Sequence, residues 1–177
     1  VADLEAFAQF NGMEVHDLKK RLAAGREQLL AARALRIRPG LDDKILLGWN
    51  ALMCSAYTAA YKAMAEESFR ITAVRNMDFL LEKFASANGD SLLHTWKDGE
   101  AQYDAFLEDY AFLIAALVDI YEITFDVNYL RSAEKYTRLV LSYFLDPVTG
   151  LFYFTGSGQT DIVLRKKDLQ DNATPSG

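Results

Sequence analysis

The feature that most constrains this chain is a series of five helix-like segments in which one-sided and all-round apolar patterns alternate. Segments at about 15–36, 66–84 and 128–145 carry apolar residues along one face and polar residues elsewhere. Segments at about 45–60 and 106–124 are apolar or small nearly all round. One-sided helices cover a core, whereas helices that are apolar all round are buried in it. The alternation therefore predicts an inner layer of helices wrapped by an outer layer.

The pattern repeats after about 60 residues. Phe84 and Phe144 stand 60 residues apart, and a glycine turn with an alternating apolar run follows each of them. Trp49 and Tyr110, which are 61 residues apart, open the two buried segments. Glycine turns beside alternating residues are typical of β-hairpins. The sequence thus predicts an all-α fold, a partial (α/α)6 toroid of helical hairpins with small β-hairpin loops.

The length of the chain sets how much of such a ring it holds. At about 60 residues per unit, 177 residues hold roughly three of the six hairpins that a closed ring needs. We therefore expect residues 1–177 to be a fragment of one α/α-toroid domain. A half-ring has apolar edges, so we also expect the fragment to self-associate.

Charge and apolar patterning narrow the classes of partner. The chain has 19 Lys and Arg against 25 Asp and Glu, a net charge of −6, and an acidic surface repels phosphate backbones. The longest strongly apolar stretch, 110–120, is shorter than a bilayer-spanning helix. We therefore expect neither a nucleic-acid nor a membrane partner.

The cysteine and histidine content predicts a reducing environment and no metal. Cys54 is the single cysteine and lies in an apolar run, which favours a buried thiol in a reducing compartment. No signal-peptide pattern is visible, so the predicted location is cytoplasmic. His16 and His94 are far apart in sequence and have no cysteine partner, so we expect no metal site, and no motif predicts a cofactor.

Three motifs, in one order and spacing, resemble the thioredoxin-fused, six-hairpin glycosidase-like family. They are Arg33-x-x-Arg36-x-Arg38-Pro39-x-x-Asp42-Asp43-Lys44-x-x-x-x-Trp49-Asn50-x-Leu52-Met53, Phe106-Leu107-Glu108-Asp109-Tyr110-Ala111-Phe112, and Ala173-Thr174-Pro175-Ser176-Gly177. The resemblance runs from about residue 14 to the end. It implies an (α/α)6 toroid similar to N-acylglucosamine 2-epimerase and glycoside hydrolases. The family's thioredoxin-like domain has no counterpart here, because the chain has no Cys-x-x-Cys.

The same resemblance implies a carbohydrate-related function. The domain would bind a sugar, or act on one as an isomerase, an epimerase or a glycoside hydrolase. The alternative is a non-catalytic helical scaffold for a protein partner or for the thioredoxin-like domain of the parent chain. Fold analogy alone does not decide between these functions.

Acidic pairs open both buried segments. Asp42 and Asp43 precede the first, and Glu108 and Asp109 begin the second. Such carboxylates cap the free N–H groups of a helix start, or they line a central cavity. Glycoside hydrolysis uses two carboxyl groups, one protonated and one ionised. Because neighbours on a helix point about 100° apart, we predict that Asp43 pairs with Asp109 rather than Glu108 with Asp109.

Residues beside these acids are predicted to contact the sugar. Trp49 is expected to stack on a sugar ring, while Asn50 and Asp42 bind hydroxyl groups. Glu108 and Tyr110 occupy the equivalent place at the second buried segment and are expected to line the same cavity.

Two further side chains complete the predicted site. His94 lies in the first hairpin loop and is predicted to assist acid–base chemistry. Arg165 is a candidate for binding an acidic sugar, the alternative being a solvated strand end. Asp171 and Ser176 are expected to precede the next inner helix.

Overall fold

A computed structural model describes residues 3–159 and 162–167 of the chain. The chain divides into two compact units, Val1–Asp42 and Asp43–Gly177. Asp171, Ser176 and the motif 173–177 lie outside the described residues.

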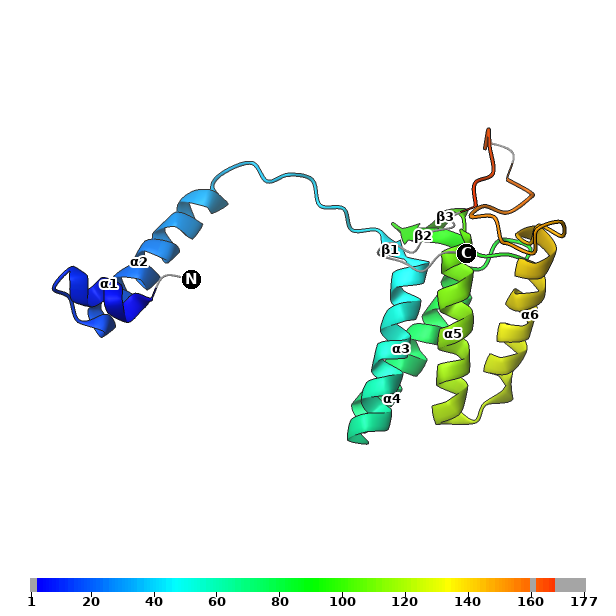
Figure 1. The fold of residues 1–177 in the computed structure, drawn as a ribbon, viewed down its shortest axis with the longest axis horizontal. Coiled ribbons are helices and arrows are strands. Elements are labelled where there is room, and N and C mark those ends of the chain that lie inside the picture. The colour runs from blue at the N-terminus through cyan, green and yellow to red at the C-terminus, as the bar shows by residue number, and fades with distance from the viewer. Residues whose placement is uncertain (1–2, 160–161, 168–177) are drawn as a thin grey trace. The chain divides into compact units, whose positions relative to one another are not determined.

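The first unit is a pair of helices, α1 (Leu4–Phe10) and α2 (Val15–Ala34) (Figure 1). The carboxylate of Asp3 caps α1 by accepting a hydrogen bond from the backbone N–H of Glu5 at 2.9 Å. The helix predicted at 15–36 is confirmed as α2, and no helix continues through the segment that contains Pro39.

The second unit holds two helical hairpins and a small sheet. Its helices are α3 (Leu47–Met64), α4 (Glu67–Lys83), α5 (Leu107–Thr124) and α6 (Val127–Tyr143). α3 packs against both α4 and α5, and α5 packs against α6 (Figure 1). This arrangement confirms the predicted helical-hairpin architecture.

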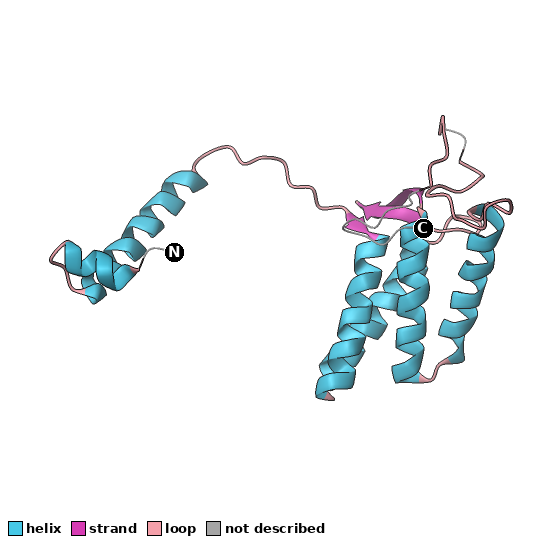
Figure 2. Ribbon diagram, viewed as in Figure 1, coloured by secondary structure: helices cyan, strands magenta, loops and turns pink. Residues whose placement is uncertain are grey.

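A three-stranded antiparallel sheet lies at the end of this unit where α3 and α5 begin (Figure 2). The order is β1 (Ile45–Leu46), β2 (Leu93–Lys97) and β3 (Glu100–Asp104). Asp98 and Gly99 join β2 to β3 with φ values of 52° and 89°. A positive φ at both turn positions matches the twist of a tight hairpin, so the first predicted hairpin is confirmed.

The predicted repeat holds in the structure with an offset of 60 residues. α3 and α5 each have 18 residues and begin at Leu47 and Leu107, and α4 and α6 each have 17 residues and begin at Glu67 and Val127. The predicted equivalence of Trp49 with Tyr110 is therefore wrong by one position. Trp49 corresponds to Asp109.

The loops repeat as well as the helices. The helices α3 and α5 both end on a left-handed residue, Ala65 with φ 54° and Phe125 with φ 57°. After α4 the N–H of Leu93 donates to the carbonyl of Phe84, and after α6 the N–H of Tyr153 donates to the carbonyl of Phe144.

The second predicted hairpin, however, is reduced in the described residues to a single bridge between Leu145 and Phe152.

The core of the second unit lies between the two hairpins. Its largest fully buried apolar side chains come from α3, α4, α5 and the segment that follows α4: Leu47, Met77, Leu80, Phe84, Leu92, Leu113, Leu117 and Ile120. α3 was predicted to be buried on most sides, and that expectation holds for one face only. Trp49, Leu52 and Met53 are 69%, 45% and 51% exposed, because α4, α5 and the sheet pack against other faces of α3.

Cys54 is fully buried in this core, as predicted. Burial raises the pKa of its thiol from 9.0 to about 11, although a hydrogen bond from Asn76 opposes the shift. At pH 8 only about one thiol in a thousand is then ionised.

We expect Cys54 in the folded chain to react with Ellman's reagent at pH 8 at least about 100-fold more slowly than in urea. Because the folded-state pKa is the higher one, the thiol's contribution to stability is present below pH 9.0 and is lost as the pH rises to about 11. Equal reaction rates in buffer and in urea would contradict this burial.

Candidate functional site

Asp109, in the first turn of α5, is the centre of the candidate site. Its side chain is 2% exposed, yet both carboxylate oxygens have partners. Oδ1 accepts a hydrogen bond from the N–H of Gly48 at 3.0 Å, and Oδ2 accepts one from the N–H of Phe106 at 2.9 Å. One carboxylate therefore caps its own helix and binds the first turn of α3.

Gly48 is required by this close approach. A Cβ atom at Gly48 would lie 2.9 Å from Oδ1 of Asp109 and 3.2 Å from a ring carbon of Phe112. Any side chain at this position would push Asp109 out of its place. Gly48 therefore belongs to the site although it has no side chain that could take part in a reaction.

His94, on β2, is the third partner of Asp109. Its Nδ1 lies 2.7 Å from Oδ2 of Asp109, and its side chain is 21% exposed. When Asp109 is ionised its oxygens can only accept, so Nδ1 of His94 is then the donor of this hydrogen bond. In a neutral ring, Nε2 then keeps a free lone pair.

Aromatic rings fix the position of the imidazole. The ring centroids of Phe106 and His94 lie 4.9 Å apart, and the two ring planes are at 62° to each other. Phe106 also stacks on Phe154, with 4.8 Å between the ring centroids. Neither phenylalanine was predicted as a site residue. Only their places next to the acidic motif and in the second loop could have suggested a role.

Asp43 does not join this cluster. It is exposed, and its Oδ1 lies 2.5 Å from Nζ of Lys97 in β2. The ammonium group of Lys97 holds the pKa of Asp43 below its usual value. The described structure shows no contact between Asp43 and Asp109, so their pairing across a cavity stays a prediction.

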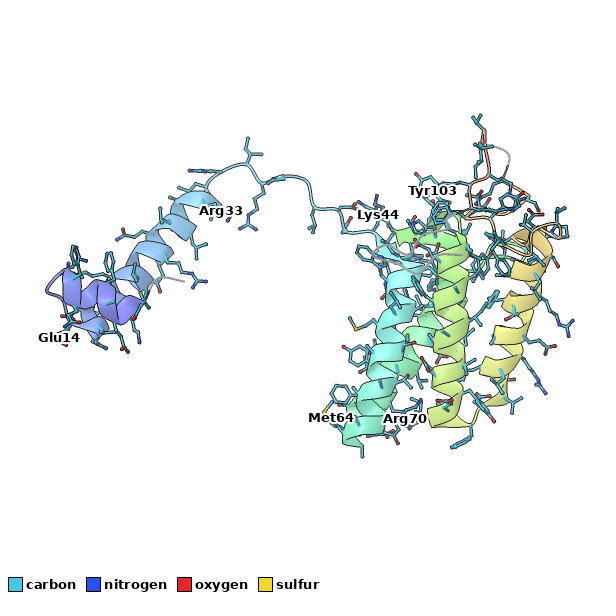
Figure 3. The ribbon with its side chains drawn as sticks, in the orientation of Figure 1. Glu14, Arg33, Lys44, Met64, Arg70 and Tyr103 are labelled. Atoms are coloured by element: carbon cyan, nitrogen blue, oxygen red, sulfur yellow. The ribbon has the colours of Figure 1, made fainter. Side chains whose placement is uncertain are left out.

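The remaining residues of the two acidic motifs lie at the same end of the second unit or just before it. Figure 3 shows Lys44 and Tyr103 at the sheet end of this unit, and Met64 and Arg70 at the far end of its helices. Trp49 is mostly exposed, and Glu108 is half-buried. Asp42 is exposed and is the last residue of the first unit.

Three of the side chains that were predicted to contact the sugar form hydrogen bonds with backbone groups. Asn50 donates from Nδ2 to the carbonyl of Leu46 at 2.9 Å. Tyr110 is buried, and its hydroxyl accepts a hydrogen bond from the N–H of Leu92 at 3.0 Å. Arg165 donates to the carbonyls of Thr155 and Tyr143. These bonds favour the structural role for Arg165 over binding of an acidic sugar.

Neither a metal cluster nor a membrane span is found in the part of the chain that the structure describes. No group of three or more His, Cys, Asp or Glu side chains there could hold a metal ion. None of the helices in the described ranges is long and apolar enough to cross a bilayer.

The sequence is similar to curated proteins over nearly its whole length. It is 33% identical over 183 residues to spermatogenesis-associated protein 20 of Mus musculus, covering 98% of this chain and 23% of that protein. The human protein of the same name is 30% identical over 185 residues. The chain therefore spans about a quarter of the length of these relatives. No protein-family model matches it.

The fold is similar to those of sugar-active enzymes. Cellobiose 2-epimerase from Bacillus thermoamylovorans matches with a TM-score of 0.61 and 18% identity over 73% of this chain and 34% of that chain. A D-mannose isomerase gives 0.59 and 17%, covering 64% and 29%. A family 105 glycoside hydrolase from C. acetobutylicum gives 0.53 and 14%, covering 88% and 48%. At these identities the similarity establishes the α/α-toroid fold alone.

Proposed function

We propose that this chain forms part of a sugar-binding site at which His94 transfers a proton. The premise is that the chain is similar in sequence to a segment of spermatogenesis-associated protein 20 and has the six-hairpin, epimerase- and glycosidase-like fold. The observation that carries the proposal is the hydrogen bond between His94 and the buried Asp109. The sugar-isomerising enzymes of similar fold support the choice of substrate class.

The proposed chemistry is that of an isomerase or epimerase. Nε2 of His94 removes a proton from the carbon next to the sugar carbonyl, and the bond electrons move to the carbonyl oxygen to give an enediolate. The imidazolium then returns a proton to that carbon or to its neighbour. Asp109 is a positioning residue, because it holds the ring in one tautomer and stabilises the imidazolium that forms.

The carboxylates favour proton transfer over glycoside hydrolysis. Hydrolysis needs one carboxylic acid and one carboxylate that both reach the substrate. Asp109 is buried and occupied by three partners, and Asp43 is paired with Lys97. In the proposed site Trp49 offers an exposed ring for stacking, while Asp43, Asp42 and Glu108 remain proposed contacts to hydroxyl groups.

The test follows deuterium uptake. The chain is incubated in D2O with mannose, glucose or cellobiose, and proton NMR measures exchange at the carbon next to the carbonyl. We expect exchange, together with a change in the His94 ring signals on sugar addition. We expect His94→Asn to lower the exchange at least about 100-fold and His16→Asn to leave it unchanged.

Asp109→Asn separates the positioning role from the catalytic one. It is expected to slow exchange and to displace its pH profile, because the ring loses the acceptor that fixes its tautomer. Exchange that survives His94→Asn would overturn the proposal, as would His94 signals that respond to none of the sugars.

A second candidate function is a non-catalytic scaffold that supports a protein partner, such as a thioredoxin-like domain. The full engagement of Asp109 favours it, since a carboxylate with three partners ties together α3, α5 and β2 without any ligand. On this alternative Asp109→Asn lowers stability, but no sugar alters the His94 signals.

A further inference from the structure

Phe154, in the loop after α6, is bonded to the start of α5. Its carbonyl accepts a hydrogen bond at 3.0 Å from the N–H of Leu107, the first residue of α5. An N–H at that position has no acceptor within its own helix. The ring of Phe154 stacks on Phe106, and Phe106 packs against His94. Phe154 is thus separated by a single ring from the imidazole that would carry the proton.

Arg165 and the residue after it hold this loop. The carbonyl of Lys166 accepts a hydrogen bond from the N–H of Phe154 at 2.8 Å. The guanidinium group of Arg165 donates to the carbonyl of Thr155 from Nε at 3.1 Å and from Nη2 at 2.9 Å. Nη2 also donates to the carbonyl of Tyr143 at 2.9 Å. One side chain therefore joins the loop to the last residue of α6.

Lys167 anchors the same segment a second time. Its Nζ donates to Oγ1 of Thr149 at 2.8 Å and forms an ion pair with the buried carboxylate of Asp146. The hydrogen bond and the charge of Lys167 lower the pKa of Asp146. Nζ of Lys167 lies 4.8 Å from the ring centroid of Tyr153, and the guanidinium carbon of Arg165 lies 4.0 Å from it. With two anchors, loss of the Arg165 contacts should leave the segment attached.

In the part that the structure describes, the second loop lacks the neighbouring strands that hold the first. Phe154 corresponds to His94, which lies on β2 between β1 and β3. Among the described residues of the second loop, a single bridge joins Leu145 to Phe152. The carbonyl of Lys166 therefore takes the place of a strand partner for the N–H of Phe154.

We infer that Arg165 is a positioning residue for His94. Its guanidinium group fixes the backbone beside Phe154, the ring of Phe154 holds that of Phe106, and Phe106 keeps the imidazole in the orientation in which it bonds to Asp109. This role rests on the proton transfer proposed for His94, and it requires no contact between Arg165 and the sugar.

Proton–nitrogen correlation NMR of the imidazole tests this role without any sugar. We expect the ring of His94 to show one tautomer, protonated at Nδ1, and Overhauser contacts with Phe106. Arg165→Met should produce a second tautomer and weaken those contacts. Arg165→Lys should restore them only in part, because an ammonium group lacks the fixed fork of donors. Arg138→Met, which removes an exposed arginine paired with Glu134 on α6, is the matched control and should change neither signal.

Deuterium exchange into mannose measures the consequence for catalysis. Arg165→Met should lower the kcat of exchange about tenfold or more and leave KM nearly unchanged, because misplacing a catalytic group by about 1 Å has an effect of this order. Phe154→Leu removes the stacking ring and keeps the backbone hydrogen bonds, so it should have a similar effect even if Arg165→Met does not fold. A raised KM at unchanged kcat for Arg165→Met would overturn the inference, because Arg165 would then contact the sugar.

Urea unfolding of the same variants separates positioning from stability. If Arg165→Met or Phe154→Leu lowers stability while His94 keeps one tautomer and its contacts with Phe106, Arg165 has a structural role only and the inference is wrong. Absence of exchange in the unsubstituted chain would overturn the proposed function alone. The imidazole signals would still decide whether Arg165 positions His94, because they are measured without a substrate.

Discussion

Asp109→Ala is expected to lower the free energy of unfolding of the chain by about 4 kcal/mol. The change leaves the N–H groups of Gly48 and Phe106 without an acceptor, and it releases the ring of His94. A buried hydrogen bond to a charged group contributes about 1.5–3 kcal/mol, and the three bonds are coupled, so the loss falls short of their sum.

Urea unfolding followed by circular dichroism measures this loss. Glu108→Ala is the matched control, because Glu108 is the preceding residue of the same helix and is half-buried, and it should change stability by about 0.5 kcal/mol or less. A loss below about 1 kcal/mol for Asp109→Ala would mean that the carboxylate does not join the two helical hairpins.

Phe84→Ala is expected to lower the free energy of unfolding by about 4 kcal/mol. Phe84 is fully buried where α4 ends. The centroid of its ring lies 6.2 Å from that of Phe79, in an edge-to-face arrangement. Removal of the ring leaves a cavity where helices and sheet meet, and a close-packed interior fills such a space only in part.

The control for this substitution is Phe125→Ala. Phe125 follows α5 in the same unit but is 75% exposed, so its loss should cost less than about 1 kcal/mol. Thermal and urea unfolding should rank the two variants identically. A Phe84 variant as stable as the Phe125 variant would contradict the burial of Phe84 in the core.

The helices could be predicted well because their signals are long and periodic. All five predicted helical segments are present, and the spacing of Phe84 and Phe144 gave the repeat length correctly. The register at the start of the buried helices was wrong by one position, because Trp49 and Tyr110 look alike as aromatic residues although Trp49 corresponds in the structure to Asp109.

The candidate site could be predicted only in part. Asp109 and His94 were chosen by residue type, but their hydrogen bond depends on how β2 pairs in the sheet, which no local pattern encodes. Gly48 was missed because a glycine in an apolar run signals nothing about a neighbour 61 residues away. The exposed face of α3 was missed because composition does not reveal which neighbours a helix has.

The 60-residue offset also bears on how the His94–Asp109 pair arose. The position equivalent to Asp109 is Trp49, and the position equivalent to His94 is Phe154. Among the described residues the pair therefore occurs once in two repeats whose helices match, and its members come from consecutive repeats: the strand of one and the helix of the next. Duplication of a single ancestral 60-residue repeat would reproduce the scaffold but not this pair. If the repeats descend from one ancestor, Asp109 and His94 are later substitutions that made the repeats differ, and they lie where one repeat joins the next.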